Sequence, residues 1–160
     1  MPLTIRDAVL GDAEAGTRVL RQSITDLCVA DHKNDPLFLS DWLSNKTPEH
    51  FRSWIAQPGV FLLVAIEDER VVGVGAVTDD GHITFNYVSP EARFRSISKA
   101  MLAALEARTI ERGCTQCTLE STKTARRFYV SNGYAEAIGT TDSCGPAPCA
   151  PMSKTLDAKV

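Results

Sequence analysis

Residues 87–102 read Tyr-Val-Ser-Pro-Glu-Ala-Arg-Phe-Arg-Ser-Ile-Ser-Lys-Ala-Met-Leu. They begin with the end of an apolar segment, residues 82–88, which Pro90 stops because proline cannot donate to a strand ladder. After a basic turn, apolar residues return at helical spacing from Ile97 onward. The sequence therefore predicts a strand, a short turn and a helix start. Such a start offers unpaired N–H groups and a positive dipole end, which together bind anions.

The charges beside this turn indicate which anion it prefers. Arg93, Arg95 and Lys99 favour a phosphate over a carboxylate, because guanidinium and ammonium groups are common phosphate ligands. An ordinary strand-to-helix turn, with serine capping and solvated arginines, remains the alternative from these residues alone.

A family resemblance favours the phosphate site. The pattern Val88-x-Pro90-x-x-Arg93-x-x-Ser96-x-Ser98-x-x-Met101 resembles the acetyl-CoA signature of the GNAT N-acetyltransferases, where a Gln/Arg-x-x-Gly-x-Gly/Ala turn wraps the cofactor pyrophosphate. Serine occupies both glycine positions; it can donate a hydroxyl but lacks the freedom of glycine at positive φ. The resemblance implies acetyl-CoA as co-substrate, no metal, and cofactor contacts from Tyr87, Val88, Arg93, Phe94, Arg95, Ser96, Ile97, Ser98, Lys99, Thr122 and Phe128.

A second match lies at residues 122–134, Thr-Lys-Thr-Ala-Arg-Arg-Phe-Tyr-Val-Ser-Asn-Gly-Tyr. It resembles the family pattern Asn-x-x-Ala-x-x-Phe/Leu-Tyr-x-x-x-Gly-Phe, with Thr122 at the asparagine position. From the residues alone, Phe128 and Tyr134 are core residues and Tyr129 is a boundary residue. The resemblance makes Tyr129 the proton donor to the departing CoA thiolate, a role that a phenol can fill.

The attacking amine must lose a proton to a side chain or to water. In histone-acetylating relatives a carboxylate lies six residues before the last apolar residue of the strand that precedes the phosphate turn. His82 occupies that position here, and histidine titrates near neutral pH. An exposed strand-end residue is the alternative interpretation of His82, and Glu120 is the alternative base.

The remaining pattern predicts an α+β (mixed α/β) fold, with a mostly antiparallel mixed sheet of about seven strands and about four flanking helices. This order is similar to the GNAT fold. The expected strands are 3–9, 60–66, 71–77, 82–88, 114–121, 134–140 and 151–156, and the expected helices are 12–28, capped by Asp12, then 36–43, 48–55, 96–112 and 124–132, with a polar break at 31–35.

Composition limits the classes of protein. The chain has 160 residues, of which 44% are hydrophobic and 23% charged, so we expect one domain, residues 1–160. A net charge of -3 argues against nucleic-acid binding. We expect a cytoplasmic protein without membrane contact, because no run of about 18 apolar residues and no signal-peptide pattern is visible.

Five cysteines without a secretion signal suggest free thiols. A zinc site formed by Cys114, Cys117, Cys144 and Cys149 is disfavoured, because a Cys-x-x-Cys pair in a strand directs its sulfurs to opposite faces. A Cys144–Cys149 disulfide in the intervening loop stays open as an alternative.

The acceptor is the least defined part of the prediction. The resemblance places part of the acceptor pocket after the first strand, which makes Asp26, His32 and Trp42 candidates for contact. Simple core packing is the alternative for Trp42, Phe51 and Trp54. The expected partner is a small-molecule or protein amine, with a homodimer possible by resemblance. The rival function is a non-catalytic acyl-CoA-binding module, such as a sensor.

Overall fold

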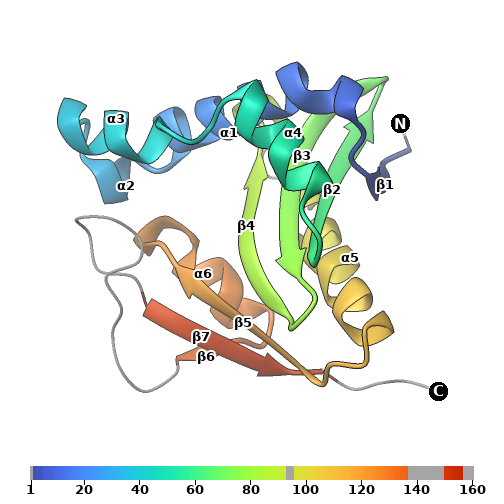
Figure 1. Ribbon diagram of the computed structural model, residues 1–160. Helices are drawn as coiled ribbons and strands as arrows, with labels where there is room; N and C mark the ends of the chain where they lie inside the picture. The colour runs from blue at the N-terminus through green and yellow to red at the C-terminus, as the bar shows by residue number, and fades with distance from the viewer. Residues whose placement is uncertain (1, 93–95, 137–149, 157–160) are drawn as a thin grey trace.

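The structure is a computed structural model that describes residues 2–92, 96–136 and 150–156. Within these residues, seven strands form one sheet in the order β1-β2-β3-β4-β5-β7-β6 (Figure 1). The strands are β1 (Thr4–Asp7), β2 (Val60–Glu67), β3 (Arg70–Thr78), β4 (His82–Val88), β5 (Gln116–Ser121), β6 (Ala135–Glu136) and β7 (Ala150–Thr155). The helices are α1 (Ala13–Leu27), α2 (Val29–His32), α3 (Pro36–Leu43), α4 (Pro48–Ala56), α5 (Ile97–Glu111) and α6 (Lys123–Ser131), with 3-10 turns η1 (Leu10–Asp12) and η2 (Pro90–Ala92).

All pairs of neighbouring strands are antiparallel except one. Strands β1 to β4 form an antiparallel run, and β5, β7 and β6 form a second one. The two runs join where β4 pairs with β5 in parallel. The predicted α+β class and mostly antiparallel sheet are therefore confirmed.

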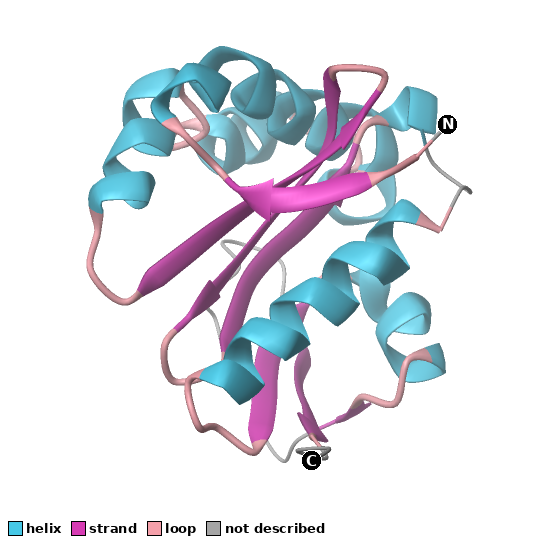
Figure 2. Cartoon of the chain, turned by 90° about the vertical axis from the view of Figure 1, so that its right-hand side faces the viewer, coloured by secondary structure: helices cyan, strands magenta, loops and turns pink. Residues whose placement is uncertain are grey.

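Helices cover both faces of the sheet, as Figure 2 shows. On one face α5 packs against β3, β4 and β2, and its buried side chains include Met101 and Leu105. On the other face α1 packs on β3 and β4, and α4 packs on β2, around Leu20 and Phe51. Apolar strands buried on both faces, such as β3, explain the continuous apolar runs in the sequence.

The contact between α1 and α4 depends on Gly16. A Cβ added there would lie 2.6 Å from Cζ of Phe51, whose ring is fully buried. We expect Gly16→Ala to lower the free energy of unfolding by about 1–3 kcal/mol, because overpacking forces the neighbours to move. Gly11→Ala is the matched control, since nothing lies within 4 Å of its added Cβ. Equal chemical-denaturation midpoints for the two variants would contradict this packing.

Both short helices before β2 begin as predicted, each with a proline in its first turn. The Asp35 side chain accepts hydrogen bonds from the N–H groups of Leu37 and Phe38 at the start of α3. Thr47 accepts from the N–H of His50 at the start of α4. These caps satisfy donors that a helix start leaves unpaired.

Two local predictions were wrong. Asp12 does not cap α1; its carboxylate pairs with Arg6 at 2.9 Å and accepts from the N–H of Val9 at 2.8 Å. Residues 31–35 are not simply a polar break, because residues 29–32 form α2. Lys33 then ends this turn with a φ of 52°. At Asp12 a side-chain partner, Arg6, overrides the local signal.

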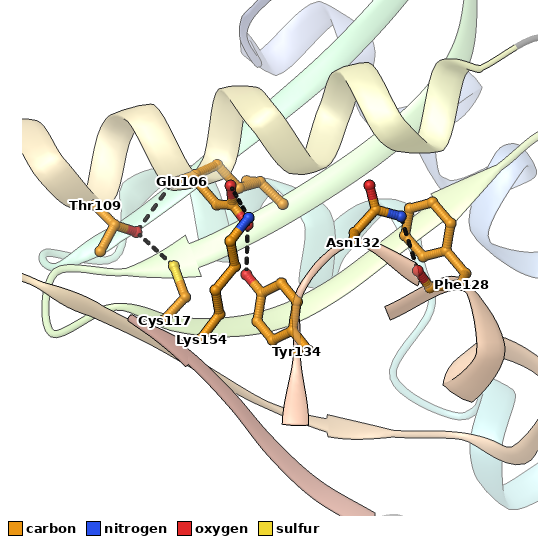
Figure 3. Close-up of polar contacts among 8 residues, drawn as sticks. Glu106, Thr109, Cys117, Phe128, Asn132, Tyr134 and Lys154 are labelled. Carbon is orange, nitrogen blue, oxygen red and sulfur yellow. Dashed lines mark hydrogen bonds and ion pairs between the residues drawn. The ribbon is translucent and has the colours of Figure 1, made fainter. Parts of the chain in front are cut away.

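A polar cluster ties α5 to the last two strands (Figure 3). The hydroxyl of Tyr134 donates to Glu106 at 2.8 Å, and Lys154 approaches the same carboxylate at 3.2 Å. Nearby, Cys117 donates to Thr109 at 3.4 Å. Tyr134 is thus a core residue, as predicted, whose polar end is satisfied. Within the described ranges, no helix is long and apolar enough to cross a bilayer.

Candidate active site between strands β4 and β5

Strands β4 and β5 stay together over only two residue pairs. His82 lies opposite Thr118 and Ile83 opposite Leu119, although β4 continues to Val88 and β5 to Ser121. Figure 1 shows the two strands diverging beyond this junction. The edge of β4 that faces β5 therefore has no ladder partner there within the described residues. Such an edge can accept an extended, amide-containing ligand as if it were another strand.

A β-bulge lies at this junction. Phe85 pairs with Ala76 and Ile83 pairs with Val77, which leaves Thr84 as an extra residue on β4. Bulges redirect side chains and are common beside active sites. Beyond the bulge, Phe85 and Tyr87 pack with the α1 and α4 side of the sheet. Asn86 faces the other way, and its amide donates to the carbonyl of Ser98 in α5 at 3.1 Å.

A cavity of about 640 Å³ opens on the α1 and α4 side of the junction. One wall consists of strand residues from β3, β4 and β5, and the other of residues from α2, α3, α4 and the loops that connect them. Its polar and charged lining includes Asp31, Asp41, Lys46, His82, Glu120 and Thr122, and its aromatic lining consists of Phe38, Trp42, Trp54, Phe85 and Tyr87.

Both candidate bases line this cavity. His82 is half-buried, and its Nδ1 lies 2.9 Å from the hydroxyl of Thr118 on β5. Glu120 lies two residues after Thr118, so the two side chains share one face of β5. The structure thus brings His82 and Glu120 to one wall of the cavity, beside the point where the strands separate.

Tyr129 lies behind this wall rather than in it. Its side chain is 6% exposed, so it is a core residue and not the boundary residue that the helix pattern predicts. Its ring meets those of Phe128 and Tyr134 edge-on, at centroid distances of 5.1 and 5.5 Å. Burial raises the pKa of the Tyr129 phenol, and the neighbouring Asn86 amide only partly offsets this. The phenol therefore stays protonated at neutral pH.

Asp31, which the sequence pattern does not indicate as a site residue, holds the start of α6. Asp31 of α2 is buried and accepts from the N–H groups of Lys123 at 2.7 Å and Thr124 at 3.1 Å. The Thr124 hydroxyl also donates to Asp31. Thr122 caps the same helix by accepting from the N–H of Ala125 at 3.2 Å. A carboxylate at a helix N-terminus is favourable, and this one fixes the helix that carries Tyr129.

The predicted phosphate turn is described only at its helical end. Arg93, Phe94 and Arg95 lie outside the described residues. Ser96 has φ 62° and ψ 17°, a left-handed conformation that glycine adopts more easily, and its side chain does not cap α5. Ile97 is buried, and Ser98 and Lys99 follow in the first turn, where helical N–H groups lack intrahelical partners.

We expect Ser96→Gly to relieve this backbone conformation. The free energy of unfolding should rise by about 0.5–1 kcal/mol, because a left-handed L-residue costs about 1–2 kcal/mol and glycine loses part of that through chain entropy. The control is Ser98→Gly inside α5, which should lower stability instead. A loss of stability in both variants, measured by urea unfolding, would contradict the account.

The other predicted contacts are distributed on both sides of the junction. Tyr87 and Thr122 line the cavity, whereas Val88 and Phe128 pack against the core on the α5 side. Burial, followed by the neighbouring Cys28, raises the pKa of the Tyr87 phenol, which is therefore neutral near pH 7.

Of the three candidates for acceptor contact, only Trp42 lines the cavity. His32 is buried, its Nε2 lies 2.9 Å from the carbonyl of Ile24, and its Nδ1 accepts from the N–H of Asn34. Both ring nitrogens are thus engaged, and the histidine joins α1 to the turn after α2. Asp26 is exposed and lies elsewhere.

Two cavity residues were not predicted as acceptor contacts. Trp54 packs against Phe85 with ring centroids 5.4 Å apart and forms part of the aromatic wall. Phe51, one turn earlier on α4, is the core residue that the pattern suggests. Lys46 is 9% exposed, and burial lowers the pKa of its ammonium group to about 8. No local pattern in the sequence signals a buried lysine.

Three cysteines are free thiols: Cys28, Cys114 and Cys117. Burial raises the pKa of the Cys28 thiol to about 12, so it is not a thiolate at neutral pH. Cys114 donates to the carbonyl of Asp79, away from the Thr109 partner of Cys117. Cys144 and Cys149 lie outside the described residues, and within those residues no cluster of three potential metal ligands occurs.

The splayed strand pair, the flanking helix starts and the mixed sheet have the arrangement that the family resemblance of the motifs implies. A family model described as the acetyltransferase (GNAT) domain matches residues 21–156. The chain belongs to the GNAT acetyltransferase family, which confirms the resemblance of its motifs. A comparison with curated protein sequences found no match.

Solved structures share this fold over nearly the full chain. The PaiA N-acetyltransferase from Thermoplasma acidophilum, in complex with coenzyme A, is 20% identical, with a TM-score of 0.84 and coverage of 98% of this chain and 100% of that one. A GCN5-related N-acetyltransferase from Rhodopseudomonas palustris is 21% identical, with a TM-score of 0.86 and coverage of 98% and 97%. YncA from Salmonella typhimurium, a putative acetyltransferase solved with acetyl-CoA, is 18% identical, with a TM-score of 0.68 and coverage of 100% and 97%.

Proposed function

We propose that the protein is an N-acetyltransferase that moves an acetyl group from acetyl-CoA to a primary amine by direct attack. The observation that carries this proposal is the separation of β4 from β5 beside a cavity that contains His82 and Glu120. The separation leaves a strand edge for an amide-containing thioester on one side. The cavity provides a place for an amine on the other.

The residues present are suited to acetyl-CoA. The β5-facing edge of β4 offers backbone groups to the pantetheine amides, and the uncapped first turn of α5 offers N–H groups to phosphate. The side-chain oxygen of Asn86 is buried on β4 and has no hydrogen-bond partner among the described residues. A buried acceptor without a donor is costly, so a donor from the bound substrate would satisfy it.

The proposed chemistry needs one base and one acid. His82, or alternatively Glu120 or water, takes the proton of the attacking amine. The nitrogen then attacks the thioester carbonyl, whose oxygen gains charge that a backbone N–H on β4 can stabilise. As the C–S bond breaks, Tyr129, whose phenol is protonated at neutral pH, gives its proton to the thiolate, and the resulting phenolate takes a proton back from water.

The direct test is release of free thiol from acetyl-CoA with a panel of amines, with product mass measured in parallel. The proposal expects acetylated product for at least one amine. Confirmed CoA binding with no turnover on any amine would favour the non-catalytic acyl-CoA-binding module. The serines at both glycine positions of the phosphate turn are the feature that favours that second candidate.

His82→Ala separates the two candidate bases. If His82 is the base, the variant should lose rate below the pKa of the acceptor amine and regain it above, because the free amine then forms without help. Glu120→Gln should lack this profile. Rates from pH 6 to 10 provide the measurement. A uniform loss in His82→Ala at every pH would indicate a structural role through its contact with Thr118.

A further inference from the structure

Lys46 is held firmly in the wall of the cavity. Its backbone carbonyl and that of Leu43 both accept from Arg21 of α1 at 3.0 Å, and its own N–H donates to Leu43. The next residue, Thr47, caps α4. These hydrogen bonds hold the backbone of the loop between α3 and α4 and therefore the position from which the Lys46 side chain extends.

The charge of Lys46 has no counter-charge in the described part of the chain. Its Nζ lies 3.4 Å from the carbonyl of Trp42 and also contacts the side-chain oxygen of Asn45, both of which are neutral acceptors. None of the ion pairs among the described residues includes Lys46. An ammonium group has three donors, so one donor and the net charge remain available. A buried charge of this kind is costly unless something pairs with it.

The two walls of the cavity differ in chemistry. The strand wall carries the candidate bases His82 and Glu120, whereas the helical wall carries Lys46 together with Asp41 and with Asp31, which is bound to the start of α6. Trp54 and Phe85, in contact with each other, belong to the aromatic surface of the same cavity. A ligand with an amine at one end, an apolar body and an anion at the other would match this order.

We propose that Lys46 binds a carboxylate of the acceptor, so that the acceptor class is an amine that also bears a carboxylate and an aromatic or other apolar body. The inference rests on the proposed function, because the amine end is assigned to the wall where acetyl transfer would occur. A carboxylate would supply the missing counter-charge and would accept a hydrogen bond from the remaining N–H of Lys46. A polyamine lacks the carboxylate and would leave the Lys46 ammonium group without a counter-charge.

Kinetics on matched acceptors test this inference. L-Phenylalanine and L-phenylalaninamide share the same apolar body and differ at the carboxylate, and their rates are compared at equal concentrations of the free amine because the amine of the amide is less basic. We expect the wild type to favour the acid in kcat/KM, and Lys46→Gln to raise KM for the acid at least tenfold while changing KM for the amide less than threefold. Lys33→Gln removes an exposed lysine outside the cavity and should change neither. If Lys46 served only to cap α3 through the carbonyl of Trp42, Lys46→Gln would instead change KM for both acceptors by the same factor.

Binding can be measured without turnover. The chain has two tryptophans, Trp42 and Trp54, and both line the cavity, so intrinsic fluorescence reports on its occupancy. In fluorescence titrations we expect 3-phenylpropionate to bind with a lower Kd than 3-phenylpropionamide. This preference should be lost in Lys46→Gln. Neither probe has an amine, and neither can be acetylated.

The pH dependence of this binding has a defined sign. Lys46 is charged below its pKa of about 8, so affinity for 3-phenylpropionate should fall as pH rises from 8 to 9.5 while affinity for the amide stays flat. The change in affinity between pH 8 and 9.5 should disappear in Lys46→Gln, which keeps the other charged groups of the cavity. They are Asp31 on α2, Asp41 on α3, His82 on β4 and Glu120 on β5.

The outcomes separate this inference from the proposed function. Equal use of acid and amide, equal probe affinities, or spermidine as the preferred acceptor would overturn the carboxylate site while leaving acetyl transfer intact. Acetylation of no amine, together with Lys46-dependent binding of 3-phenylpropionate, would overturn the proposed transfer and support the carboxylate site.

Discussion

Tyr129→Phe should lower kcat for acetyl transfer by about 10²- to 10³-fold, the range expected when a positioned proton donor is removed. The change deletes one oxygen from a side chain that is 6% exposed, so the ring contacts with Phe128 and Tyr134 remain. Without the phenol, the thiolate must leave unprotonated or take its proton from water. Acetyl-CoA affinity should stay nearly unchanged, because the loss falls on the transition state.

Tyr134→Phe is the matched control for this variant. It removes a phenol of the same kind, whose hydroxyl donates to Glu106 in the polar cluster that joins α5 to β6 and β7. That change should reduce stability by about 1 kcal/mol and leave kcat unaffected. Thiol-release kinetics and calorimetric titration on both variants decide the point. Full activity in Tyr129→Phe would show that Tyr129 is not the proton donor.

Asp31→Ala should have the largest effect on stability at the site. Asp31 accepts from two backbone N–H groups and one hydroxyl at the start of α6, from a position 92 residues earlier than Lys123. Because these part-buried bonds go to a charged acceptor, we expect their loss to cost about 2–3 kcal/mol and to lower Tm by about 4–10 °C. Asp31→Asn keeps one carbonyl acceptor and should lose about half as much.

The exposed cap Asp35 provides the comparison for Asp31. It accepts from Leu37 and Phe38 within its own helix, and Asp35→Ala should cost about 1 kcal/mol or less. The test compares the Tm of Asp31→Ala with that of Asp35→Ala in thermal unfolding. Equal losses would mean that the contact between α2 and α6 adds nothing beyond an ordinary helix cap.

Much of the fold is predictable because its signals are local. The apolar runs of β2, β3 and β4 and the Asp-Gly turn at Gly81 predict an antiparallel run that the structure confirms. The helix starts at Pro36 and Pro48 are equally local. The family motifs place Tyr129 on the helix that follows β5, and His82 at the start of β4.

What the sequence does not predict depends on long-range contact. Asp31 appears as part of a polar break, because its partners in α6 are distant along the chain. Lys46 gives no local signal, because its place in the fold depends on distant residues such as Arg21, 25 residues earlier in the chain. The burial of Tyr129 follows from its packing in the core against Tyr134, which helical periodicity alone does not show. The acceptor side of the cavity consists mainly of such residues.

The central claim is that acetyl-CoA binds where β4 and β5 separate, and calorimetric titration tests it most directly. Acetyl-CoA and CoA should each bind the purified wild-type protein at one site per chain with micromolar affinity. Absence of binding by either compound, in a protein shown to be folded by its cooperative unfolding, would contradict the account.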